Sequence, residues 1–145
     1  MTFLLDVNVL IALIDPTHVS HDAAHLWFHR EGRRSWATCP ITENGVIRIV
    51  GSSKYPNTPG SPAVVAEIVR QLREAPGHVF WADSASLLDS KRVDISEVLT
   101  AKQVTDSYLL ALAVEHGGGL ATFDRRLSTK AVNGGKSALH LIVAD

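Results

Sequence analysis

The sequence predicts a three-layer α/β/α fold built around a central, mostly parallel sheet of five strands. Five short apolar segments alternate with stretches of helical periodicity. Strands that are apolar throughout are typical of parallel sheets that helices cover on both faces. The chain has 145 residues, of which 46% are hydrophobic and 20% charged. This is the size and composition of one globular domain, so we expect residues 1–145 to form a single domain.

The first half of the chain should contain two strands and three helices. The expected elements are a strand over 2–5, a helix over 7–14, a helix over about 20–30, a strand over 35–38 and a helix over 41–50. Pro16 ends the first helix, because a proline cannot donate the hydrogen bond that a helix interior requires. Gly32 ends the second helix and Gly51 ends the third.

The second half begins with a loop over 51–60, which is rich in glycine, proline and serine. Ser61 and Pro62 then form a cap and first-turn pair for a helix whose apolar stripe continues to Leu72. Pro76 and Gly77 follow the end of that helix.

The C-terminal third is less regular. Residues 83–103 read as a mixture of helix and loop, and Thr105 is expected to cap a buried helix that the glycines at 117–119 end. The remaining expected strands lie over 78–82, 120–123 and 139–143.

Composition excludes several classes of site. Cys39 is the only cysteine, so an internal disulfide and a cysteine-rich zinc site are excluded, and its apolar neighbours predict a core position. A reducing cytoplasm is the expected location. No stretch approaches the roughly 18 apolar residues of a membrane span, and the apolar N-terminus lacks a signal peptide's basic leading region. Net charge is −1, but four acids in a metal site would leave −1 + 4 = +3 elsewhere, so charge does not decide whether nucleic acid binds.

Acidic side chains follow the predicted strands. Asp6 and Asp124 come directly after strands, and Glu43 lies in the first turn of the helix after the strand over 35–38. Because active sites of parallel sheets form beyond the carboxyl ends of the strands, these three acids should share one edge. The position of Asp106 does not follow from spacing, since its helix precedes the strand that ends at Asp124.

Each of these acids alone suits a helix cap or first turn. Together they are costly, because two carboxylates ~5 Å apart repel by about 3 kcal/mol at an effective dielectric of 20. A bound cation offsets such repulsion. Because the available ligands are carboxylate oxygens, the expected ion is Mg²⁺ or Mn²⁺.

Four segments resemble the PIN-domain ribonucleases, in particular the VapC toxins of type II toxin–antitoxin pairs. They are 4–11, 40–45, 105–111 and 120–124, which match the acidic motifs of that family in order and approximate spacing. The resemblance implies a metal-dependent endoribonuclease that hydrolyses RNA with metal-activated water. It also implies a cognate VapB-type antitoxin and a homodimer as partners.

The resemblance assigns the metal ligands and the supporting groups. Asp6, Glu43, Asp106 and Asp124 correspond to the catalytic, metal-binding acids, while Asn8 and Thr122 correspond to polar side chains that orient them. Many members carry a further polar or acidic residue shortly after the fourth acid. This chain instead has two arginines and a leucine over 125–127, so the sequence does not decide whether the site binds one metal ion or two.

Several basic and aromatic residues have two interpretations. Arg125, Arg126 and Lys54 are candidates for contacts to RNA phosphates, or are simply solvated side chains. His21, His25 and His29 recur every four residues, but the outer two lie ~12 Å apart along a helix and cannot share one ion. We expect them on an exposed or rim face. The aromatic residues expected in the core rather than as stacking platforms for bases are Trp27, Phe28, Trp36 and Trp81.

Two alternative functions stay open. The start of the chain, with Asp6 and Asn8 one residue apart, resembles the Asp-x-Asp-x motif of haloacid-dehalogenase phosphatases, but Asn8 cannot act as the general acid of that reaction. The second alternative is a catalytically silent PIN-like module that binds RNA or a protein partner.

Overall fold

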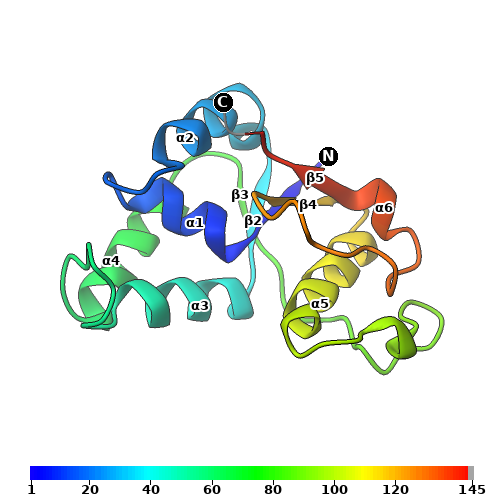
Figure 1. The fold of residues 1–145 in the computed structure, drawn as a ribbon. Helices are drawn as coiled ribbons and strands as arrows, with labels where there is room; N and C mark the ends of the chain where they lie inside the picture. Colours follow the sequence, from blue (N-terminus) through cyan, green and yellow to red (C-terminus); the bar gives the residue numbers. More distant parts are fainter. Residues whose placement is uncertain (144–145) are drawn as a thin grey trace.

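A single five-stranded sheet, parallel throughout, forms the centre of the molecule (Figure 1). The computed structural model describes residues 1–143. The strand order is β3-β2-β1-β4-β5. The strands are β1 (Phe3–Leu5), β2 (Trp36–Thr38), β3 (His78–Phe80), β4 (Gly119–Thr122) and β5 (Leu139–Leu141). The predicted strands and their parallel arrangement are confirmed; four of the strands are slightly shorter than predicted, and β4 begins and ends one residue earlier.

Helices cover both faces of the sheet, which makes the three layers that the sequence predicts (Figure 1). On one side lie α1 (Val7–Ile14), α2 (His21–Arg30), α3 (Pro40–Val50) and α4 (Pro62–Arg73); on the other lie α5 (Lys102–Glu115) and α6 (Gly135–Ala138). Two short 3₁₀ turns, η1 (Gly32–Arg34) and η2 (Ile95–Glu97), complete the elements. None of the helices in the described residues is long and apolar enough to cross a membrane.

Alternation of side chains along the central strands divides the core in two. Leu4 packs in the cluster under α5, while Leu5 packs in the cluster under α1 to α4, and both side chains are fully buried. Leu120 and Ala121 of β4 divide in the same way. Both faces of these strands are therefore apolar, which explains why the sequence shows continuous apolar runs instead of alternating ones.

The ends of the helices follow from local chemistry at most positions. Ser61 caps α4 by accepting a hydrogen bond from the backbone N–H of Val64 (3.4 Å), and α1 ends at Ile14, two residues before Pro16. Gly51 ends α3 as predicted, for a reason of space: a Cβ at this position would lie 2.5 Å from the carbonyl oxygen of Ile47.

The prediction that Thr105 caps the buried helix is wrong. Helix α5 begins at Lys102, three residues earlier. The side-chain oxygen Oε1 of Gln103 accepts hydrogen bonds from the backbone N–H groups of Leu99 (2.7 Å) and Thr100 (3.1 Å), so it organises the chain that enters the helix. Asp106 is consequently the fifth residue of α5 and lies in its second turn.

The three histidines of α2 occupy a rim, as predicted. His25 and His29 are exposed and His21 is partly buried. The ring of His21 hydrogen-bonds through Nδ1 to the carbonyl oxygen of Ala12 (2.7 Å), and the ring of His25 through Nε2 to that of Leu13 (2.8 Å). His21 and His25 therefore provide hydrogen-bond partners for carbonyl groups at the end of α1, which otherwise lack partners within the helix.

The core positions predicted for single residues are also confirmed. Cys39 and Trp36 are fully buried, and Trp27 and Trp81 are 7% and 6% exposed. Phe28 is half-buried and packs edge-on against Trp36, with ring centroids 5.3 Å apart.

Candidate metal centre

Asp6 lies where β1 ends and α1 begins, so one residue serves both as helix cap and as the centre of a polar network. Its Oδ1 accepts a hydrogen bond from the backbone N–H of Val7 (2.7 Å). Its own N–H donates to the carbonyl of Ala121 in β4 (3.0 Å). The residue is 7% exposed, so this carboxylate is held firmly at the carboxyl edge of the two central strands.

Asn8 and Thr122 fix the other carboxylate oxygen of Asp6. The Thr122 hydroxyl donates to Asp6 Oδ2 (2.7 Å), and the Asn8 amide donates to Thr122 Oγ1 (3.2 Å) and, at 3.5 Å, to Asp6 Oδ2. Asn8 Oδ1 accepts the backbone N–H of Phe123 (3.3 Å), and Thr122 Oγ1 accepts that of Asp124 (3.1 Å). The two side chains assigned as supporting groups thus connect the ends of β1 and β4.

Three of the four candidate acids influence one another electrostatically. Burial raises the pKa of Asp6, and the charge of Asp124 raises it further. The pKa of Asp106 is raised to about 6, mainly by burial and then by the charges of Asp6 and Asp124, with Lys102 acting in the opposite direction. Asp106 of α5 therefore lies close enough to Asp6 and Asp124 for their charges to affect it, which sequence spacing could not establish.

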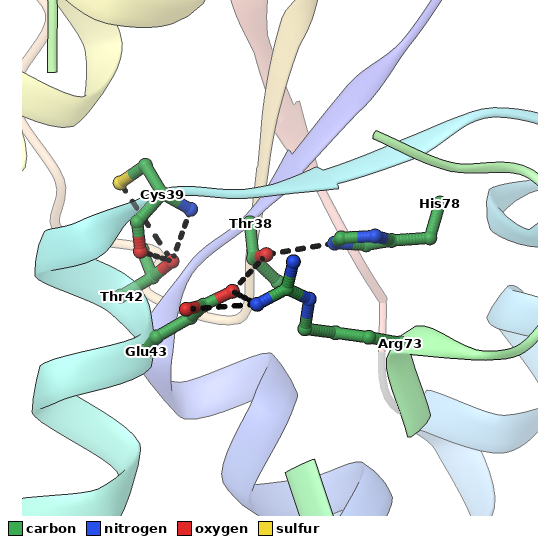
Figure 2. A network of polar contacts seen from close by, with 6 residues as sticks. All are labelled: Thr38, Cys39, Thr42, Glu43, Arg73 and His78. Carbon is green, nitrogen blue, oxygen red and sulfur yellow. Dashed lines mark hydrogen bonds and ion pairs between the residues drawn. The ribbon is translucent and has the colours of Figure 1, made fainter. Parts of the chain in front are cut away.

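Glu43, the fourth candidate acid, has a different environment (Figure 2). Its Oε2 accepts a hydrogen bond from the Thr38 hydroxyl (2.6 Å) and pairs with the Arg73 guanidinium (3.1 Å). The Glu43 side chain is 18% exposed, so its charge is largely removed from water and is balanced by a cation of the protein itself. Arg73 comes from the last residue of α4 and also stacks over Phe80, 5.2 Å from the ring centroid.

His78 completes this second cluster. Its Nε2 lies 2.8 Å from Thr38 Oγ1 (Figure 2). Since the Thr38 hydroxyl hydrogen points to Glu43, His78 must donate from Nε2–H, which is possible in the neutral ring. Burial and the charge of Arg73 lower the pKa of His78, in keeping with that neutral form, although Glu43 opposes the shift. Sequence analysis missed Arg73, Thr38 and His78, because only the fold brings α4 and β3 beside the start of α3.

The acids fit a divalent cation by their chemistry. Among residues 1–143, no three His, Cys, Asp or Glu side chains stand close enough together to enclose one ion as they lie. Mg²⁺ does not need such a cage, because it keeps several of its waters and commonly binds through one or two carboxylates. The raised pKa values of Asp6 and Asp106 mean that burial and neighbouring negative charge outweigh the hydrogen bonds to Asp6 and the charge of Lys102 near Asp106.

The three candidate residues for RNA contacts, Arg125, Arg126 and Lys54, are all exposed but come from two different parts of the chain. Arg125 and Arg126 are exposed and directly follow Asp124, whose Oδ1 accepts the backbone N–H of Arg126 (2.9 Å). Lys54 is also exposed, in the turn region between α3 and α4. The two arginines are thus adjacent in sequence to the carboxylates, whereas Lys54 is held in a separate loop.

Known proteins share both the sequence pattern and the fold. A family profile described as "PIN domain" matches residues 3–133. The chain is similar to Ribonuclease VapC44 of Mycobacterium tuberculosis, with 45% identity over 134 residues (92% of this chain and 94% of that protein). It is similar to Ribonuclease VapC39 of the same organism, with 42% identity over 134 residues (92% and 96%). A crystal structure of VapBC2 from Rickettsia felis bound to a promoter DNA fragment aligns with a TM-score of 0.59, 12% identity and coverage of 97% and 98%, a likeness of fold alone.

Proposed function

Because this chain belongs to the PIN-domain family, we propose that it is a metal-dependent endoribonuclease and the toxin of a VapBC-type toxin–antitoxin pair. One structural observation carries the assignment of the site. Asp6, Asp106 and Asp124 come from three different parts of the chain. Burial and the charges of Asp6 and Asp124 raise the pKa of Asp106, and burial and the charge of Asp124 raise the pKa of Asp6. Carboxylates whose ionised forms are disfavoured by burial and by one another's charge favour a bound divalent cation.

Asp6, Asp106 and Asp124 would hold Mg²⁺ or Mn²⁺ in this proposal, and Glu43, in the first turn of α3, would serve as a fourth carboxylate ligand. The bound ion lowers the pKa of water and neutralises charge on the scissile phosphate. Thr122 and Asn8 keep the Asp6 carboxylate in one orientation through their hydrogen bonds. Arg73 balances Glu43 and holds its oxygens toward Thr38.

The proposed partners follow from the family and from the charge of the site. RNA is the substrate, and Arg125, Arg126 and Lys54 are exposed cations available to its phosphates. The antitoxin is a VapB-type protein, as in the VapBC2 complex of Rickettsia felis. A homodimer is the proposed assembly, and its mass in solution can be measured directly.

The test of this proposal is cleavage of RNA by the purified chain with Mg²⁺, with Mn²⁺ and with EDTA. We expect cleavage with either ion and none with EDTA. Asp6→Asn should abolish cleavage but keep the fold, because asparagine has nearly the same shape and its single oxygen can still cap α1 by accepting the Val7 N–H, while the charge is lost. The matched control is Asp22→Asn, which removes one charge from an exposed position in α2 and should cleave normally.

Two results would argue against the proposal. Full activity of the Asp6→Asn variant, or cleavage that resists EDTA, would exclude these carboxylates as metal ligands. The toxin role is tested in cells, where expression of the wild-type chain should arrest growth and the Asp6→Asn variant or co-expressed antitoxin should not.

The binding-module alternative remains distinguishable by experiment. A PIN-like module without activity would gain thermal stability from Mn²⁺ but would cleave no RNA. The phosphatase alternative is not supported, because the family match over residues 3–133 assigns the opening motif to the PIN domain.

A further inference from the structure

A basic cavity of about 550 Å³ lies on the α5 and α6 side of the molecule, and none of the four candidate metal-binding acids lines it. Two segments line it: the chain that precedes α5 and the chain between β4 and the end of α6 (Figure 1). Its lining residues include four cations and one acid, which are Lys91, Arg92, Lys130, Lys136 and Asp94. We call it the basic pocket.

The fold holds the two walls of the basic pocket together. Val93 and Val132 form an antiparallel bridge, and the backbone N–H of Asp94 donates to the carbonyl of Ala131 (2.8 Å). The N–H of Asn133 donates to the carbonyl of Arg92 (2.9 Å). Val93 and Val132 are 3% and 5% exposed and belong to the core under α5. The cations beside them therefore project from anchored backbone and not from a loose loop.

The α6 wall is also fixed by close packing. A Cβ at Gly135 would lie 2.8 Å from Leu110 Cδ2 of α5, so only glycine allows this approach. Lys136 follows directly and is exposed. The backbone that carries Lys136 at the rim of the basic pocket is thus fixed by contact with α5.

The positive charge of the basic pocket has no internal partner. Within residues 1–143, none of its four cations forms an ion pair with a carboxylate. The carboxylate of Asp94, the one acid of the lining, already accepts the backbone N–H (3.1 Å) and hydroxyl (2.6 Å) of Ser96. Gathering like charges without counter-charges is unfavourable, and a bound polyanion would offset it.

The geometry points to the basic pocket as a second binding site for the phosphodiester backbone of the RNA substrate. The pocket would bind nucleotides that lie on one side of the scissile bond. This inference rests on the proposed function. Lys130 is six residues beyond Asp124, so their Cα atoms are at most about 22 Å apart. Arg125 and Arg126 occupy the intervening chain and are exposed. A single strand that crosses the carboxylates can therefore reach the basic pocket within a few nucleotides.

Charge reversal with a matched control tests this inference. The test variant carries Lys130→Glu and Lys136→Glu. The control carries Arg33→Glu and Arg34→Glu, which changes net charge equally at exposed positions of η1, before the amino end of β2. Thermal unfolding of all three proteins confirms that each is folded. Binding is measured in EDTA, by the fluorescence anisotropy of a labelled single-stranded oligouridine of about twenty nucleotides, over a series of salt concentrations.

For single strands the slope of log affinity against log salt falls by about 0.7 for each lost phosphate contact. The test variant should therefore have a slope smaller by about 1.4 and weaker binding at low salt, while the control keeps the wild-type slope. Equal changes in the two variants, or no change in either, would overturn the inference.

Cleavage separates this inference from the proposed function. With Mg²⁺ or Mn²⁺, the test variant should show a raised KM for a long RNA and an unchanged kcat. It should cleave a dinucleotide at the wild-type rate, because the only phosphate of a dinucleotide is the scissile one and none is left for the basic pocket. A wild-type chain that cleaves no RNA contradicts the proposed function, whereas wild-type cleavage with an unaffected test variant contradicts only the basic pocket as an RNA site.

Discussion

Replacing Asp106 with asparagine should stabilise the metal-free protein while destroying its activity. The pKa of Asp106 rises from 3.8 to about 6 because the residue is buried and faces Asp6 and Asp124. Each pKa unit corresponds to about 1.4 kcal/mol, so the shift corresponds to about 3 kcal/mol. Solvent reaches this half-buried carboxyl group and screens the interaction, so the expected gain is roughly 1–2 kcal/mol. For a chain of this length that is about 3 to 8 °C in Tm.

The sign of the effect depends on pH in a defined way. Because the folded-state pKa of Asp106 is raised, the native state keeps its proton to higher pH than the unfolded chain does. Stability is therefore lost as pH rises from about 4 to 6, and the full penalty is present above that range. Asparagine cannot ionise, so the Asp106→Asn variant should exceed the wild type in stability near pH 8 and match it more closely near pH 4.

Urea denaturation followed by circular dichroism, with EDTA present, measures this difference. Asp22→Asn is the control, since Asp22 is exposed in the first turn of α2, where a negative charge is mildly favourable. Added Mn²⁺ should then stabilise the wild type and have little effect on Asp106→Asn. An Asp106→Asn protein that is less stable than the wild type near pH 8 would refute the claim that this carboxylate is destabilised by its neighbours.

Three further predictions concern the same site and its support. Arg73→Gln should lower stability by at most about 1 kcal/mol, because the ion pair with Glu43 is partly exposed. It should also tighten Mn²⁺ binding measured by calorimetry, because it removes a cation that competes for Glu43, and weaker binding would contradict this. Mn²⁺ affinity should be constant above about pH 7 and fall about tenfold per unit well below pH 6, since the ion must displace the Asp106 proton, whereas an affinity independent of pH would contradict it. Tyr55→Phe should destabilise the protein by roughly 2 kcal/mol near pH 7, because Tyr55 donates a hydrogen bond to the buried carboxylate of Asp15. The difference in stability between variant and wild type should shrink as pH falls from about 4 to 2, and a difference independent of pH would contradict this role of Asp15.

The direction of that last effect follows from the surroundings of Asp15. Burial raises its pKa, but hydrogen bonds from Tyr55, Thr17 and Asn57 together outweigh burial and lower the pKa to about 2. A lowered pKa in the folded state adds stability above the unfolded value, and that stability is lost as pH falls through the folded value. Asp15 thereby ties the end of α1 to the loop before α4.

Sequence patterns predicted the sheet because both of its faces are buried. Leu4 and Leu5 point into different cores, and an apolar run of this kind leaves little choice but a covered parallel strand. Asp6 follows β1 directly and Asp124 comes two residues after the end of β4, so their shared edge could be predicted as well. That residues 1–145 form one domain stays a prediction.

The environment of Glu43 could not be predicted in the same way. Its partner Arg73 is thirty residues away in the sequence and reaches Glu43 only because α4 packs against α3. The Thr38 hydroxyl and the His78 ring belong to neighbouring strands, whose register is a property of the assembled sheet. Interactions of this kind depend on tertiary packing, on which local propensity and spacing carry no information.

The position of Asp106 distinguishes a structural acid from a functional one. Asp6 caps α1 and Glu43 lies in the first turn of α3, so each has a stabilising role at a helix N-terminus in addition to any other role. Asp106 is the fifth residue of α5, beyond the first turn in which the helix dipole favours negative charge. It caps nothing, and its ionised form is disfavoured by burial and by two neighbouring carboxylates. If Asp106 lowers the stability of the metal-free fold, as predicted, its charge serves neither a helix end nor the folded state, and a bound cation would account for it. Asp106 is therefore the acid whose replacement tests the proposed metal site most directly.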